Sequence, residues 1–258
     1  MKLEGKKIIV TGGANGVGRA ITEEYLKQGA KVYFVDVNEE RGEKQLETLR
    51  KRGFREAHFE MLDISDREST FEVFAEATRQ MGGLDVLANL ADIYRPDPGA
   101  TTLESEIDFN LDVNVKGTVF TNQAAYSLMK IEGGGSIINF GSLSALNPHP
   151  GSAAYSLSKG AVHSWSRTVA HEWGEDNVRV NCILPEMATE MYETWVAGMT
   201  EKEREVHRLT VTDNIPLGHT YGDPERDLAP VMTFFASDDA HFITGQLIPV
   251  DGGLASTR

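Results

Sequence analysis

The chain has 258 residues, enough for one α/β domain with a substantial core, and its hydrophobic and charged fractions of 40% and 25% are ordinary for a globular protein. Its formal net charge of −14 opposes binding to nucleic-acid phosphates, anionic membranes and acidic carrier proteins. No apolar run reaches the roughly 18 residues of a membrane span, and the single Cys182 excludes an internal disulfide, so we expect a cytoplasmic protein that binds no membrane.

Short β-branched segments alternate with longer helical patterns from the N-terminus onward. The first predicted strand covers Lys7–Val10, and its apolar run is too short for a signal-peptide core. The later predicted strands cover Lys31–Asp36, Ala57–Leu62, Leu84–Ala88, Ser136–Phe140, Val178–Leu184 and Gln246–Val250. The predicted helices cover Gly16–Gln28, Glu39–Arg52, Arg67–Met81, Leu103–Lys130, Ala153–Trp173 and Pro224–Ala236. This alternation predicts a single α/β domain over residues 1–258, a doubly wound parallel sheet of about seven strands with helices on both faces.

One region interrupts the alternation. The segment Glu186–Leu217 is rich in Met, Glu and Thr, and it is longer than an ordinary connection between a strand and a helix. It follows the carboxyl end of a predicted strand, where doubly wound sheets bind their ligands. We expect it to form a substrate lid. The alternative is a short helical excursion that only covers the sheet.

A glycine-rich loop follows the first predicted strand and leads into the first predicted helix. Glycines let backbone N–H groups approach a pyrophosphate, whose charge a helix N-terminus stabilises. The spacing G-x-x-x-G-x-G differs from the commoner G-x-G-x-x-G, and any tight turn uses glycines, but the strand–loop–helix context is that of a dinucleotide site. The expected cofactor contacts in this loop are Gly12, Asn15, Gly16, Val17 and Gly18.

The second predicted strand ends at Asp36, 18 residues after Gly18. A carboxylate at this place accepts hydrogen bonds from the adenosine ribose hydroxyls and repels the 2′-phosphate of NADP. Neither Asn15 nor Val37 is basic, so neither compensates that phosphate. The alternative role is a helix cap, for which Asn38 is better placed. The sequence therefore predicts NAD as the cofactor.

The clearest chemical signal is the pair Tyr155 and Lys159. Residues four apart share one face of a helix. A lysine ammonium beside a phenol stabilises the phenolate and lowers the tyrosine pKa, typically by ~1–3 units. General acid–base catalysis requires such a shift toward the working pH.

A second pair, Tyr126 and Lys130, has the same spacing. The position 13 residues before Tyr126 is Val113, whereas Ser142 stands 13 residues before Tyr155, just beyond the fifth predicted strand. A hydroxyl there lies at the carboxyl edge of the sheet. We therefore expect the pair with Tyr155 to be reactive and the other to be an ordinary helix-surface pair.

Together these motifs resemble the short-chain dehydrogenase/reductase family over essentially the whole chain. The matching residues are the loop Thr11–Gly18, Asp36, Asp63, Asn89-Leu90-Ala91, Asn114, Ser142, Tyr155, Lys159, Pro185 and Thr189. The resemblance implies a Rossmann fold and reversible hydride transfer between NAD and a secondary alcohol or ketone, without a metal. It also implies pairing of the helical regions Leu103–Lys130 and Ala153–Trp173, and of the last strand, between subunits. We expect a homotetramer, with a dimer as the alternative.

The resemblance also implies a role for each site residue. Tyr155 would exchange a proton with the substrate oxygen, and Ser142 would orient that oxygen. Lys159 would lower the tyrosine pKa and bind the nicotinamide ribose, while Asn114 would hold a water relay from the lysine to solvent. The remaining cofactor contacts would be Asp63 and Ile64 at the adenine, Asn89 after the fourth strand, and Pro185 and Thr189 at the carboxamide.

The residues themselves leave other roles open for two of these side chains. Asn114 is equally placed to be a buried helix residue that satisfies backbone groups. Asp63 is equally placed to cap the helix that begins after Ser65. Further candidates for contact with the substrate, each of which has a packing or surface alternative, are Tyr94, Ser144, Asn147, His149, Glu186, Tyr192 and Trp195.

Two positions depart from the family pattern, which has Asn-Asn-Ala-Gly after the fourth strand and Pro-Gly after the sixth. Here Asp92 and Glu186 replace the two glycines. If both carboxylates face the site, an anionic substrate meets a Coulomb cost of about 1 kcal/mol per charge, so we expect neutral or amine-bearing alcohols. The alternative is that both face solvent or cap backbone groups.

Two other classes of function remain open. A catalytically silent, NAD-sensing regulatory protein would share the fold, although the full set Asn114, Ser142, Tyr155 and Lys159 opposes this reading. A nucleotide-sugar epimerase or dehydratase also carries Tyr-x-x-x-Lys. Such proteins have a larger C-terminal substrate domain, whereas eight residues follow Val250 here.

Overall fold

The computed structural model describes residues 1–255, with the backbone alone at Met191 and Thr210. The described residues form a seven-stranded sheet in the order β3-β2-β1-β4-β5-β6-β7, and every neighbouring pair is parallel. The strands are β1 Lys7–Thr11, β2 Lys31–Asp36, β3 Ala57–Met61, β4 Val86–Asn89, β5 Gly135–Phe140, β6 Val178–Pro185 and β7 Leu247–Val250. The predicted doubly wound sheet is confirmed.

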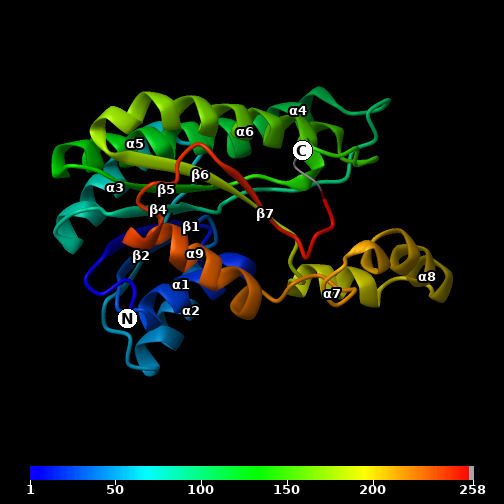
Figure 1. Cartoon of the computed structure of the whole chain (residues 1–258), viewed down its shortest axis with the longest axis horizontal. Coiled ribbons are helices and arrows are strands. Elements are labelled where there is room, and N and C mark those ends of the chain that lie inside the picture. Colours follow the sequence, from blue (N-terminus) through cyan, green and yellow to red (C-terminus); the bar gives the residue numbers. More distant parts are fainter. Residues whose placement is uncertain (256–258) are drawn as a thin grey trace.

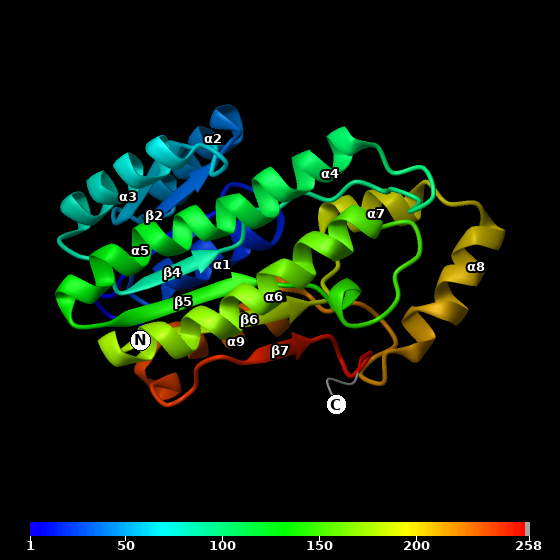
Figure 2. The ribbon, with the colours of Figure 1, turned by 90° about the horizontal axis from the view of Figure 1, so that it is seen from above.

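Helices cover both faces of the sheet (Figures 1 and 2). On one face lie α1 Gly16–Lys27, α2 Glu39–Lys51 and α9 Ala229–Ala236, which share a core cluster with the strands. On the other lie α3 Arg67–Met81, α5 Thr118–Glu132 and α6 Ala153–Trp173, with a second core cluster. Because both faces are covered, the inner strands are apolar and buried along nearly their whole length. Cys182 of β6 is fully buried, as its apolar strand predicts.

The strand order reverses direction at β1, which pairs with β2 on one side and β4 on the other. In doubly wound sheets, ligands bind outside the carboxyl ends of the strands at this switch point. The loops after β1, β2, β4, β5 and β6 all leave the sheet at that edge. The fold therefore brings the glycine loop, Asp36, Asp92, Ser142 and Glu186 toward one side of the molecule.

The predicted helical region Leu103–Lys130 is helical almost throughout, but it is not a single α-helix. The structure has α4 over Glu104–Asn110, a π-helical segment over Leu111–Gly117, and then α5. A π-helical turn continues the helix with a wider turn instead of ending it, so it lies inside the predicted helical region. A second π-helical segment, Pro224–Leu228, precedes α9.

The expected lid region contains two helices, α7 Glu190–Ala197 and α8 Glu201–Thr210. In Figure 1 α7 lies beside the carboxyl edge of the sheet, and α8 extends away from the body of the molecule. Backbone hydrogen bonds between Glu186, Ala188 and Gly222 tie the start of the region to the segment before α9. None of the described helices is long and apolar enough to cross a membrane.

Candidate active site

A groove of about 650 Å³ runs along the carboxyl edge of the sheet. It brings together most residues that the sequence predicts for the site. The predicted residues that line it are Gly12, Asn15, Gly16, Val17, Gly18, Asp36, Asp63, Ile64, Ser142, Tyr155, Pro185 and Thr189. The groove therefore joins the glycine loop at one end to the tyrosine at the other.

The glycine loop has the backbone that a dinucleotide site needs. A side chain at Gly18 would place its Cβ 2.0 Å from the carbonyl oxygen of Gly12, so only glycine allows α1 to begin this close to the loop. Gly16 has a φ of 49°, and nothing lies within 4 Å of the position that a Cβ would take. This open space faces the N-terminus of α1, where an anion is stabilised. The residues present fit the pyrophosphate of a nicotinamide dinucleotide.

The adenosine end of the groove holds Asp36 and a basic residue that the sequence reasoning did not consider. The Asp36 carboxylate accepts the backbone N–H groups of Ala14 at 3.2 Å and of Asn38 at 3.0 Å. Asn38 caps α2 by accepting the N–H of Arg41, as predicted. The side of the groove next to Asp36 is lined by Arg41. Of the residues that could compensate a 2′-phosphate, the sequence analysis considered Asn15 and Val37, and Arg41 is a further candidate.

Two further predicted cofactor residues, Asp63 and Asn89, make hydrogen bonds within the chain. Asp63 does not cap α3, because Asp66 does so, and Asp63 instead accepts the N–H and hydroxyl of Ser65. Asn89 is buried and is not among the residues that line the groove, and its expected contact with the cofactor stays a prediction. Its amide bonds to the side chains of Thr11, Thr118, Thr121 and Asn139. These bonds tie β1, β4, β5 and α5 together below the groove.

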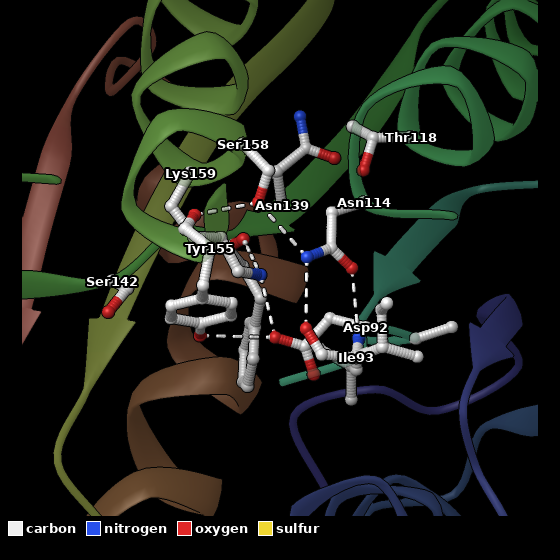
Figure 3. Close-up of polar contacts among 12 residues, drawn as sticks. Asp92, Ile93, Asn114, Thr118, Asn139, Ser142, Tyr155, Ser158 and Lys159 are labelled. Carbon is white, nitrogen blue, oxygen red and sulfur yellow. Dashed lines mark hydrogen bonds and ion pairs between the residues drawn. The ribbon is translucent and has the colours of Figure 1, made fainter. Parts of the chain in front are cut away.

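The reactive end of the groove is built around Tyr155 and Lys159 in the first turns of α6 (Figure 3). The Lys159 side chain is 2% exposed, and its Nζ donates to the Phe140 carbonyl at 3.0 Å. The same Nζ lies 2.8 Å from Oδ2 of Asp92. The Tyr155 hydroxyl donates to this Oδ2 at 3.3 Å. One carboxylate oxygen therefore contacts both members of the catalytic pair.

This arrangement changes the expected electrostatics of the tyrosine. Burial raises the pKa of Tyr155 well above its usual value, and the charge and hydrogen bond of Asp92 raise it further. The Glu186 charge acts in the same direction, while Ser142 lowers the pKa. The pKa of Tyr155 is therefore raised and not lowered as expected, and the Lys159 ammonium is paired with Asp92.

Ser142 is held by contacts on both sides. Its hydroxyl accepts the Ser144 N–H at 3.2 Å and lies 2.9 Å from the Ser144 hydroxyl. Its own N–H donates to Nε2 of the buried His163 at 3.2 Å. Burial, followed by the charges of Lys159 and Arg167, lowers the pKa of His163 to about 4, so the ring stays neutral and can accept. Sequence reasoning missed His163, although its position four residues after Lys159 puts both on one face of α6.

Asn114 lies in the π-helical segment and is buried. Its amide accepts the N–H of Ile93 at 2.9 Å and donates to the carbonyl of Ile93 at 3.0 Å. It also donates to the Ser158 hydroxyl at 3.0 Å. Asn114 thus satisfies backbone groups, as its alternative reading predicts, and fixes the residue next to Asp92. Its part in a water relay stays a prediction.

The candidate substrate residues divide into two groups. Tyr94, Glu186 and Tyr192 line the groove, and the Tyr94 ring stands edge-on to Tyr155 with 5.1 Å between centroids. Burial, with the charge of Asp251, raises the pKa of Glu186 to about 7. The candidates outside the groove are Ser144, Asn147, His149 and Trp195. Among the described residues, no group of three or more His, Cys, Asp and Glu side chains is arranged to hold a metal.

The family model and two relatives that match this chain are named as reductases or dehydrogenases. A family model described as Enoyl-(Acyl carrier protein) reductase matches residues 12–255. The chain is 35% identical to the 3-oxoacyl-[acyl-carrier-protein] reductase FabG of Thermotoga maritima, over 98% of this chain and 99% of that protein. It is 37% identical to the 2,5-dichloro-2,5-cyclohexadiene-1,4-diol dehydrogenase LinX of Sphingobium indicum, over 98% and 97%.

Solved structures agree with this result. A structure of NAD⁺-bound xylitol dehydrogenase superimposes with a TM-score of 0.89 at 27% identity, covering 98% of this chain and 100% of that chain. A short-chain type dehydrogenase/reductase from Mycobacterium ulcerans gives 0.90 at 28% identity, covering 98% and 91%. Both similarities extend over almost the full length of the two chains being compared.

Proposed function

Since this chain belongs to the short-chain dehydrogenase/reductase family, we propose that it transfers a hydride between NAD and a secondary alcohol or ketone, with Tyr155 as the general acid and base. The observation that carries the proposal is the groove that joins the glycine loop to Tyr155 and Ser142. A silent NAD-sensing protein would not need a half-buried tyrosine beside a buried lysine at the end of that groove.

Each residue then has a physical task. The loop Gly12–Gly18 and the N-terminus of α1 hold the pyrophosphate, and Asp36 accepts hydrogen bonds from the adenosine ribose. Tyr155 donates its proton to a substrate carbonyl oxygen, or receives one from an alcohol. Ser142 donates a hydrogen bond to the same oxygen, with its backbone held by His163. The bound nicotinamide supplies the hydride acceptor or donor.

The preference for NAD rests on Asp36, which repels a 2′-phosphate. Arg41 next to it acts in the opposite direction, so the ratio of kcat/KM for NAD and NADP is the direct measure. We propose that NAD is preferred. A preference for NADP in the wild-type protein would refute this part of the proposal.

Relatives named for acyl-carrier-protein substrates make reduction of a 3-oxoacyl thioester the second candidate. The net charge of −14, together with Asp92 and Glu186 in the groove, opposes an acidic carrier at this site. A screen of NADH absorbance against sugars, polyols, hydroxysteroids, aryl alcohols, hydroxy acids and one 3-oxoacyl thioester separates the candidates. NADH binding without turnover of any compound would support the silent regulatory protein instead.

We also propose a homotetramer, with a dimer as the alternative. Leu157 on α6 is 57% exposed, and Phe242 before β7 is 94% exposed. Leu157 stands on α6, which the resemblance to the family pairs between subunits, and Phe242 stands five residues before β7, so burial of both between subunits is supported. Light scattering at micromolar concentration measures the mass, and a monomer mass would contradict the proposal.

A further inference from the structure

The carboxylate of Asp92 contacts both members of the Tyr155–Lys159 pair. Its Oδ2 contacts the Lys159 ammonium at 2.8 Å and the Tyr155 hydroxyl at 3.3 Å, and Figure 3 shows both contacts converging on this one oxygen. The side chain is 34% exposed, so it extends from the buried lysine to the open groove. It is an ion-pair partner on one side and a hydrogen-bond acceptor on the other.

The loop that carries Asp92 is held by Asn114. The Asn114 side chain accepts the N–H of Ile93, the residue after Asp92, at 2.9 Å and donates to the Ile93 carbonyl at 3.0 Å. Asn114 also bonds to Ser158, which immediately precedes Lys159 on α6. The loop after β4 and the first turns of α6 are thus connected through one buried amide. The contact of Asp92 with the catalytic pair follows from this framework.

We propose that Asp92 is a positioning residue that keeps Tyr155 as a hydrogen-bond donor and holds the Lys159 ammonium away from the phenol, so that the site favours protonation of a substrate carbonyl. The effect on catalysis rests on the proposed hydride transfer. The positioning itself rests on the contacts of Asp92 with Lys159 and Tyr155 in the protein without cofactor. A phenolate formed next to Asp92 would face a negative charge that an ordinary member of the family, with glycine there, lacks. Carbonyl reduction therefore remains effective to higher pH, and alcohol oxidation begins only at higher pH.

The other groups around the phenol do not supply the same effect. The charged groups that face it are Lys159 from α6, Asp92 after β4 and Glu186 after β6. The remaining neighbours are the Ser142 hydroxyl after β5 and the edge-on Tyr94 ring. Glu186 acts through its charge alone, whereas Asp92 also accepts the hydrogen bond of the phenol. Glu186→Gln is therefore the matched control for a carboxylate in the groove.

The kinetic test compares pH profiles of alcohol oxidation and ketone reduction for wild type, Asp92→Asn and Glu186→Gln. In Asp92→Asn the rising limb of oxidation should move to lower pH by about one unit or more, the usual size for a close charge. Ketone reduction by Asp92→Asn should decline at correspondingly lower pH than in wild type. Glu186→Gln should shift the pH profiles of oxidation and reduction by less than Asp92→Asn does. An unchanged limb in Asp92→Asn, or one that moves to higher pH, would overturn the proposal.

A second measurement needs neither cofactor nor substrate. Ultraviolet difference titration of tyrosine ionisation in the free protein isolates Tyr155 when each protein is compared with its own Tyr155→Phe variant. The isolated step should occur at lower pH in Asp92→Asn than in wild type, and equal positions would sink the inference. Asp92→Gly, which restores the family residue, gives the same comparison if the asparagine variant does not fold. If the free protein behaves as expected but no alcohol turns over, the proposed function fails and the positioning role stands.

Discussion

The chain contains two Tyr-x-x-x-Lys pairs, and each is joined to an aspartate. Tyr155 and Lys159 both contact the carboxylate of Asp92. Tyr126 on α5 donates its hydroxyl proton to Asp176, which also pairs with Lys130 at 3.0 Å. The spacing and the chemical partners are therefore the same at both places. The difference between them shows what turns a common motif into a reactive one.

The two clusters lie at opposite ends of the sheet. Asp92 follows the carboxyl end of β4, whereas Asp176 stands two residues before the amino end of β6. The helix α6 connects them, with Tyr155 near its start and Trp173 at its end, about 27 Å apart along the axis. Only the carboxyl edge of a doubly wound sheet gathers the loops that form a ligand groove.

Burial also separates the two pairs. The Lys159 side chain is 2% exposed, whereas that of Lys130 is 53% exposed and its charge is screened by water. Tyr126 stacks on the Trp173 ring with 4.3 Å between centroids and serves packing. Spacing on a helix thus predicts that two side chains meet, while the chemistry depends on what else surrounds them.

The largest expected effect comes from exchanging tyrosine for phenylalanine in each pair. Tyr155→Phe removes the proton donor but keeps the ring, so turnover should fall by about 10²–10⁴-fold while NADH still binds. Tyr126→Phe should leave turnover within about twofold of wild type, because Tyr126 is not among the residues that line the groove. Steady-state kinetics with NADH binding by fluorescence distinguishes the two. Equal losses in both variants would mean that the assignment of the reactive pair is mistaken.

Replacing the two lysines should give the next largest difference. Lys159→Met leaves the Asp92 carboxylate without its ammonium partner and should weaken both turnover and NADH binding by at least about tenfold, since a lost charge–charge contact of this kind costs more than 1 kcal/mol. Lys130→Met removes a solvent-screened pair and should change neither. Kinetics and NADH titration measure both effects. NADH binding unchanged in Lys159→Met would show that this lysine does not act on the cofactor side of the groove.

Cofactor choice sharpens the comparison, since the groove connects only the Tyr155 pair to the glycine loop. Asp36→Ala removes the ribose acceptor and the repulsion of a 2′-phosphate, and it leaves Arg41 in place beside the phosphate position. The ratio of kcat/KM for NAD over NADP should fall about tenfold, which corresponds to the loss of about one charge-assisted hydrogen bond. Asp36→Asn keeps the size of the side chain, and its ratio should lie between those of wild type and Asp36→Ala. A ratio that stays constant in both variants would exclude Asp36 from cofactor selection.

The sequence predicted the sheet and the reactive pair well, because these depend on local patterns. Buried parallel strands read as short apolar runs, and most strand ends lie within two residues of prediction. The asymmetry of the two tyrosine pairs followed from Ser142, which marks the carboxyl edge of a strand. Asn38 was identified as the cap of α2 from its position alone.

Features that depend on contacts between distant segments could not be predicted. The orientation of the Asp92 side chain depends on the hydrogen bond between Ile93 and Asn114, which is 21 residues away in the chain. The π-helical segment that carries Asn114 lies inside a predicted helical region, and the sequence analysis did not distinguish it from the α-helix around it. In these cases the sequence identifies the residue but not its three-dimensional surroundings.

The smallest expected effect on turnover concerns the two histidines of α6. His163 is buried at the catalytic end, and His171 is exposed toward the other end. The pKa of His163 is lowered to about 4, so the unfolded chain, with a histidine pKa near about 6.5, takes up a proton first as the pH falls. Stability from the neutral ring is thus complete above that pH and is lost as the pH falls toward about 4.

Denaturant unfolding near pH 7 and near pH 5 tests this expectation with a matched pair of variants. Wild type and His171→Gln should lose stability to the same extent on acidification, whereas His163→Gln should lose less, because the glutamine oxygen accepts the Ser142 N–H without titrating. Turnover of His163→Gln should fall only about two- to fivefold, in line with the loss of part of one neutral hydrogen bond. If His163→Gln and wild type respond equally to acid, the neutral ring of His163 does not support the backbone of Ser142.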